Sequence, residues 1–137
     1  MLIPTAIIED DGLLTRYLIE LFVTDPGGSA LTVGDGKCYF VVPAALNGRN
    51  LISAHAAVTT VSSSGLPTIQ IANVTQAVDM LSIKITIDAN ENTSYSADTI
   101  SVIDTTNDDV ATGDLLRVDL DVAGTGAKGL IVILEFA

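Results

Sequence analysis

The sequence predicts an all-β protein, and three observations support this. Apolar and polar residues alternate with a period of two along several segments, as they do from Leu81 to Asp88. Clusters of turn-forming residues, such as Asp25-Pro26-Gly27-Gly28, separate these segments at intervals of roughly ten residues. No apolar pattern of helical period is long enough to predict a helix. Short alternating strands joined by such turns are typical of an antiparallel sandwich or barrel.

The first half of the chain contains four expected strands. The first lies near residues 17–24 and is mostly apolar on both faces. The second, near 37–43, follows the turn at residues 34–36. The third, near 51–61, alternates between Ile52, Ala54 and Val58 on one face and polar residues such as His55 on the other. In the fourth, near 67–74, Ile69 alternates with polar neighbours.

The second half of the chain contains four more expected strands. The alternation around Ile83 predicts a strand near 79–88, and another near 99–104 lies between two turn clusters rich in Asn and Asp. Around Val118 apolar residues alternate with Arg117 and Asp119, which predicts a strand near 115–122. The last strand, near 129–136, is apolar on both faces. About eight strands in two antiparallel sheets match the count of a jelly-roll-like sandwich.

The domain organisation is expected to be simple. With 137 residues the chain fits one domain. We expect a single sandwich domain over residues 17–137, preceded by an N-terminal arm over residues 1–16 that reaches a neighbouring subunit. Residues 43–46 could form a single turn, and residues 74–78 could form a short turn or a bulge within a strand. No stretch is apolar for long enough to span a membrane, and the first residues lack the pattern of a signal peptide.

Charge narrows the range of partners. The formal net charge is −11, so the surface repels phosphate groups, and neither nucleic acid nor an anionic membrane is expected as a partner. The acidity itself is explained by solubility. The single cysteine, Cys38, lies in an apolar run and is expected to be a buried thiol that packs as a small hydrophobe.

The residues do not predict catalysis. The single histidine, His55, has no recognisable nucleophile motif around it, and no phosphate-binding or dinucleotide-binding loop is present. Carboxylates are plentiful, and pairs such as Asp119 and Asp121 could bind Ca²⁺, but no spacing matches a known calcium loop, and a solvated acidic rim is favoured. We therefore expect a protein that is not an enzyme, with no cofactor and no metal site.

Two strands have no polar face, and this predicts an interface. In a two-layer sandwich one face of each strand meets water, so strands that are apolar on both faces need a second cover. A neighbouring subunit or the N-terminal arm could supply that cover, although a central strand beneath a long loop would also account for the pattern. The expected interface residues are Ile3, Ile7, Ile8, Leu18, Phe22, Ile131 and Ile133.

From about residue 18 to the C-terminus, the chain resembles small jelly-roll structural domains in the virions of tailed bacteriophages. The resemblance is a pattern of strands and turns, with no catalytic motif. It lies in the stretches Leu21–Ala30, Gly34–Pro43, Ile69–Ser82, Asp109–Asp114, Arg117–Val122 and Lys128–Leu130.

The resemblance implies a location in the virion, most directly on the capsid surface, as a cement or decoration protein that stabilises the phage head. Such domains are commonly trimeric, so the implied partners are further copies of the chain, in a homotrimer, and the major capsid protein or another virion structural protein. The chain has no repetitive shaft, which a tail fibre would carry. The alternative is a tail or fibre-tip domain that binds a host receptor or glycan, for which Glu91, Asn92 and Tyr95 are the expected contacts.

Overall fold

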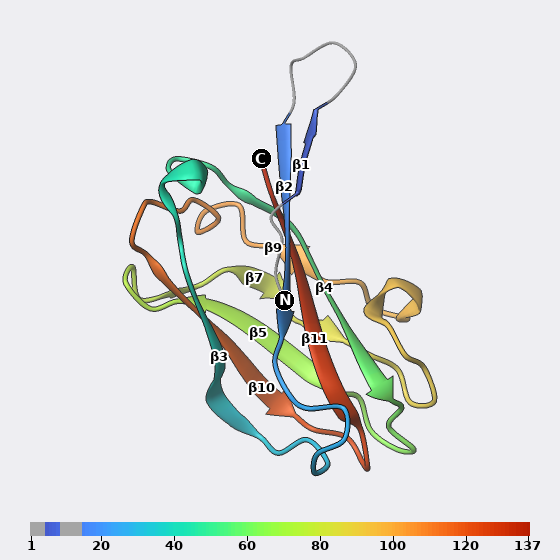
Figure 1. Ribbon diagram of the computed structural model, residues 1–137. Coiled ribbons are helices and arrows are strands. Elements are labelled where there is room, and N and C mark those ends of the chain that lie inside the picture. Colours follow the sequence, from blue (N-terminus) through green and yellow to red (C-terminus); the bar gives the residue numbers. More distant parts are fainter. Residues whose placement is uncertain (1–4, 9–14) are drawn as a thin grey trace.

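The computed structural model describes residues 5–8 and 15–137, and it confirms an all-β, two-sheet antiparallel sandwich (Figure 1). Sheet A has the order β1-β2-β11-β4 and consists of β1 (Thr5–Ile8), β2 (Thr15–Phe22), β11 (Lys128–Phe136) and β4 (Leu51–Thr60). Sheet B has the order β3-β10-β5-β6, with β8 also paired to β5, and consists of β3 (Gly34–Val41), β10 (Leu115–Val122), β5 (Thr68–Asn73), β6 (Val78–Asp79) and β8 (Ile85–Thr86). A two-stranded ribbon is formed by β7 (Leu81–Ile83) and β9 (Val102–Ile103).

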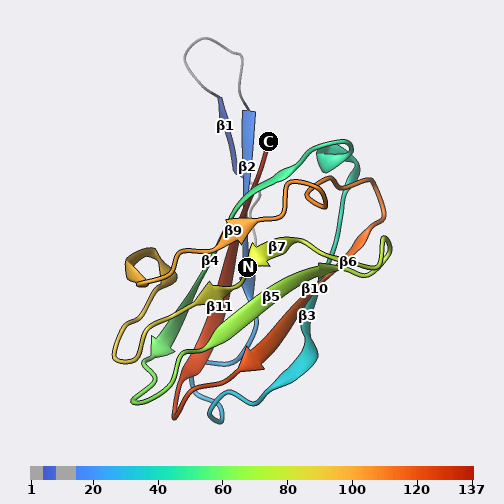
Figure 2. The same cartoon turned by 180° about the vertical axis from the view of Figure 1, so that it is seen from behind.

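The strand order is that of a jelly-roll-like sandwich. Successive strands from β2 to β5 lie alternately in sheet A and sheet B, and the chain changes sheet again between β10 and β11. β10 lies between β3 and β5 in sheet B, and β11 lies between β2 and β4 in sheet A. All four of these pairings are antiparallel. Figure 2 shows sheet B from the other side, with β10 between β3 and β5.

The two sheets enclose one apolar core. Every second residue of the long strands points inward, as the period of a strand requires. Leu116, Val118 and Leu120 of β10 are almost fully buried, and Leu130 and Val132 of β11 are completely so. Cys38, expected to be buried, is partly buried at the edge of this core.

The strand expected at 79–88 is broken into three short pieces. β6 and β8 pair with β5, but β7 between them leaves β5 and pairs with β9. The buried side chain of Gln70 fills the gap, because its Oε1 accepts the Leu81 N–H at 3.1 Å and its Nε2 donates to the Leu81 carbonyl at 3.0 Å. A side-chain amide therefore replaces one rung of the backbone ladder.

Other elements agree with the sequence expectations or are shorter. The expected turn at 43–46 contains a single 3-10 turn, η1 (Ala44–Leu46), and residues 74–77 form a hydrogen-bonded turn. The strand expected at 99–104 is reduced to the two residues of β9. A second 3-10 turn, η2 (Ser94–Ser96), was not expected. No helix within residues 5–8 and 15–137 is long and apolar enough to cross a membrane.

The N-terminal strands form a ladder that extends past the sandwich. β1 pairs with the first half of β2, from Thr5 opposite Leu18 to Ile8 opposite Thr15. β11 pairs with β2 only from Tyr17 onward, so the start of β2 and the end of β1 that is paired with it, Ile7 and Ile8, lie beyond the end of β11 (Figure 1). The arm expected over residues 1–16 thus overlaps β1 and the first two residues of β2, while residues 1–4 and 9–14 lie outside the described part of the chain.

A buried carboxylate anchors the start of β10. Asp114 Oδ2 accepts hydrogen bonds from Asn73 Nδ2 at 3.0 Å, the Ala111 N–H at 3.0 Å and Gln76 Nε2 at 2.9 Å. Burial by itself would raise the pKa of the Asp114 carboxyl, but the bonds from Asn73, Ala111 and Gln76 outweigh it and hold the pKa below its ordinary value of 3.8. The ionised form is therefore the one the fold stabilises.

This network predicts a specific pH dependence. A group whose pKa is lower in the folded state stabilises fully above its unfolded pKa, and the stabilisation is lost as the pH falls through the folded pKa. Asp114→Asn retains an acceptor but no charge, so we expect it to lower the free energy of unfolding at pH 7 by about 1–2 kcal/mol. Urea titrations of the wild-type protein and the Asp114→Asn variant should show that the difference between their free energies of unfolding narrows as the pH falls below 3.8. A difference that stays constant with pH would contradict this role for Asp114.

Candidate functional site

The strand registers of sheet A define its solvent-facing surface, which we call the outer A face. Ile131 lies between Phe22 and Ala57, Ile133 between Glu20 and His55, and Glu135 between Leu18 and Ser53. Their inward neighbours belong to the core, so these side chains point away from it. The outer A face consists of Leu18, Glu20, Phe22, Ser53, His55, Ala57, Ile131, Ile133 and Glu135, together with Tyr95 of η2, which stacks on His55.

Four of the expected interface residues meet on this face. Leu18, Phe22, Ile131 and Ile133 come from two adjacent strands, and Phe22 is 54% exposed while the other three are half-buried. Of the remaining expected residues, Ile7 and Ile8 lie in β1 opposite Arg16 and Thr15, and Ile3 lies outside the described residues.

An aromatic stack occupies the β4 side of the outer A face. The rings of His55 and Tyr95 lie 4.0 Å apart between centroids, with an angle of 18° between their planes. Tyr95 is 57% exposed, so one side of its ring covers His55 and the other side is open to solvent. Sequence analysis placed His55 and Tyr95 in separate roles, whereas the structure makes them one unit.

Ser94 holds this stack in place. Its buried Oγ accepts the Ala56 N–H at 3.0 Å and lies 2.7 Å from His55 Nδ1. The Oγ–Nδ1 distance is that of a hydrogen bond, so the Ser94 hydroxyl links the His55 ring to the edge of β4. Sequence reasoning missed Ser94, because nothing distinguishes a buried loop serine from an exposed one.

Two carboxylates of the outer A face influence the stack electrostatically. Burial lowers the pKa of His55 below its ordinary value of 6.5, and the negative charge of Glu135 opposes that shift. Burial raises the pKa of Tyr95, and the negative charges of Glu135 and Glu20 raise it further. Tyr95 therefore lies within electrostatic range of two acidic side chains, and His55 is neutral at pH 7.

The other expected receptor contacts differ from Tyr95 in their surroundings. Asn92 is committed to the edge of β4, because its carbonyl accepts the Val58 N–H at 2.8 Å and its Nδ2 donates to the Val58 carbonyl at 2.8 Å. Glu91 is exposed, and its backbone N–H donates to the Asp88 carbonyl. The structure therefore leaves Tyr95 and Glu91 available at the surface but uses Asn92 to close a strand edge.

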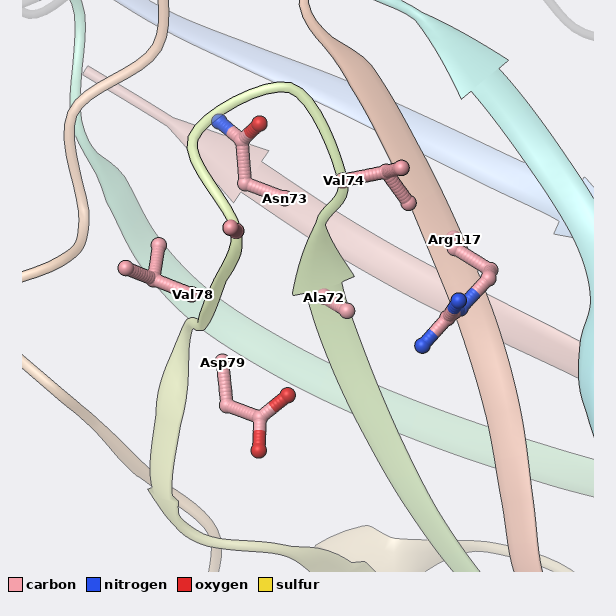
Figure 3. Close-up of a pocket in the computed structure, with 7 residues that line it drawn as sticks. Ala72, Asn73, Val74, Val78, Asp79 and Arg117 are labelled. Atoms are coloured by element: carbon pink, nitrogen blue, oxygen red, sulfur yellow. The ribbon is translucent and has the colours of Figure 1, made fainter.

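Sheet B carries a hollow on its outer face, of about 370 Å³, lined by residues of β5, β6 and β10. Figure 3 shows Arg117 and Asp79 on opposite sides of Ala72 in this hollow. The guanidinium of Arg117 is already committed, with Nε 2.7 Å and Nη2 2.9 Å from the two carboxylate oxygens of Asp119. A neutralised arginine has little attraction left for an anionic ligand, so the hollow is a weak candidate for a binding site.

The two carboxylates that sequence analysis named as a possible Ca²⁺ pair are used within the fold. Asp119 pairs with Arg117, and Asp121 pairs with Lys84 at 2.8 Å. Within residues 5–8 and 15–137, no three His, Cys, Asp or Glu side chains converge in a way that could hold a metal ion.

Comparison with known proteins adds no assignment. A scan of the chain against protein-family models finds no match, and a search of curated proteins finds no significant similarity. The candidate functional site is the outer A face, on the physical grounds given above.

Ser94 gives a direct test of how the outer A face is built. Ser94→Ala leaves the buried Ala56 N–H without an acceptor, so we expect a loss of about 1–3 kcal/mol in the free energy of unfolding. Ser96→Ala in the same turn changes an exposed side chain and should alter stability by less than about 0.5 kcal/mol. Urea unfolding of the two variants measures both values, and equal effects would show that the Ser94 hydroxyl has no special role.

Proposed function

We propose that the chain is a non-enzymatic structural protein of a phage virion, most directly a cement or decoration protein that binds the capsid and stabilises the head. The observation that supports this most is the gathering of Leu18, Phe22, Ile131 and Ile133 on the open outer A face. Apolar side chains that line one open sheet face favour a docking role, because contiguous exposed apolar surface tends to mark an interaction site.

The physical requirements of a cement protein fit this arrangement. Such a protein needs a rigid fold and one surface that binds the capsid, and the rest of its surface has to be well hydrated. The sandwich supplies the body, the outer A face supplies the contact, and the net charge of −11 keeps the remaining surface well hydrated. We propose the capsid surface as its location and the major capsid protein or another virion protein as the partner.

A homotrimer belongs to the same proposal. The β1–β2 ladder extends past the end of β11, in a position to reach a second copy of the chain. Closed threefold symmetry would cover strand edges that a single copy leaves open.

The alternative is a domain at the tail or fibre tip that binds a host receptor or glycan. One observation favours it, which is the exposed ring of Tyr95, since aromatic rings are common at recognition sites. Tyr95 shares the outer A face with the apolar residues, so both proposals use one surface and differ in where the protein sits.

The location of the protein on the virion therefore distinguishes the cement protein from the receptor-binding domain. Gold-labelled antibody against the chain, viewed on intact virions by electron microscopy, should label the whole surface of the head. The antibody should be raised to the full chain, so that an epitope hidden by docking does not abolish the signal. Label restricted to the tail or fibre tips would support the receptor-binding alternative instead. Virions that carry no label anywhere would contradict both.

A further inference from the structure

The outer A face has an excess of negative charge that the described residues do not balance. Glu20 is exposed and has no cationic partner within residues 5–8 and 15–137. Glu135 has only Arg16, whose Nη1 lies 4.0 Å away, at the outer limit of an ion pair. The acidic residues of β10 differ, because Asp119 and Asp121 form close ion pairs with Arg117 and with Lys84, which lies between β7 and β8. The outer A face is therefore acidic as well as apolar.

A second copy of the chain is a poor source of the missing cations. The chain has only six Lys and Arg residues against seventeen Asp and Glu. Lys84 and Arg117 are held in ion pairs, and Lys37 donates to Thr32 Oγ1. Arg49 is packed over the Tyr17 ring, with its Cζ 4.7 Å from the ring centroid. Charge complementarity thus favours a different protein, one that presents basic side chains.

Tyr95 has the geometry that a cation would use. One side of its ring is supported by His55, the other is open, and Glu20 and Glu135 are near enough to affect its ionisation. A guanidinium stacks well on an aromatic ring and pairs with carboxylates through the same planar group. The contact between Arg49 and Tyr17 shows this kind of stacking elsewhere in the chain. Beside the stack, Ile131, Ile133 and Phe22 offer apolar contact.

We propose that the outer A face binds a segment of a partner protein that presents an arginine next to apolar side chains. The guanidinium lies over the open side of the Tyr95 ring and meets Glu20 and Glu135, and the apolar neighbours pack on Phe22 and Ile131. The inference rests on the proposed function for the identity of the partner, a virion protein, but its chemistry can be tested on the isolated chain.

The test uses two short peptides and the full-length protein. The peptide Ac-Leu-Arg-Leu-NH₂ is titrated into ¹⁵N-labelled protein, and its twin carries citrulline, which keeps the shape of arginine without its charge. We expect the arginine peptide to shift the amide resonances of Tyr95, His55 and Ile133 and to bind about tenfold more tightly than the citrulline peptide. Added salt should weaken the binding, because the carboxylates are exposed.

Variants locate the contact. Tyr95→Ala should reduce affinity for the arginine peptide by about tenfold, whereas Tyr95→Phe keeps the ring and should stay within about twofold. Glu20→Gln should weaken binding several-fold, and Tyr39→Ala, which removes a ring of similar exposure on sheet B, should leave it unchanged.

Equal binding of the two peptides, absence of shifts with either, or shifts that map to sheet B would overturn the inference. None of these results would affect the location of the antibody label on virions. Conversely, unlabelled virions would overturn the proposed function and leave arginine-selective binding as a property of the face.

Discussion

The structure depends on one apolar layer between the two sheets. β10 and β11 lie inside their sheets, and their inward side chains, from Leu116 to Leu120 and from Leu130 to Phe136, are among the most buried in the chain. Burial of such side chains contributes roughly 1.5–3 kcal/mol each relative to exposure, which is the main force that can oppose the loss of chain entropy. Because a strand gives only every second side chain to this layer, the layer also determines which residues are left on the two outer faces.

The two outer faces meet that constraint in different ways. On sheet B, Arg117 pairs with Asp119, and the Asp119 carboxylate also accepts the Gly36 N–H at 3.0 Å, while Tyr39 and Val41 on the neighbouring strand are exposed. The outer A face has apolar side chains, an aromatic stack and two carboxylates whose charge the described residues leave largely unbalanced. Unbalanced carboxylates beside apolar side chains suit a partner that carries basic groups, and this supports the proposals of capsid binding and of an arginine-bearing segment.

Much of the fold could be predicted from the sequence, since alternation reports directly which side chains enter the apolar layer. The strands around Val118, Ile69 and Ala54 were placed within a few residues, and the apolar outer positions of β2 and β11 indicated a shared surface. The break at Leu81–Ile83 could not be predicted, because the Gln70 amide that replaces the ladder there leaves the alternation unchanged. The pairing of His55 with Tyr95 was also missed, because it depends on a buried Ser94 that sequence alone does not distinguish from its exposed neighbours.

Hydroxyl-radical footprinting of the chain, free in solution and bound in the particle, tests the central claim that the outer A face is the docking surface. Phe22, Tyr95 and Tyr39 are similarly exposed, at 54%, 57% and 53%, and aromatic rings report well in this measurement. The account predicts that Phe22 and Tyr95 lose reactivity on assembly while Tyr39 on sheet B keeps it. Protection of Tyr39 with Phe22 and Tyr95 still reactive would show that sheet B docks instead and would contradict the account.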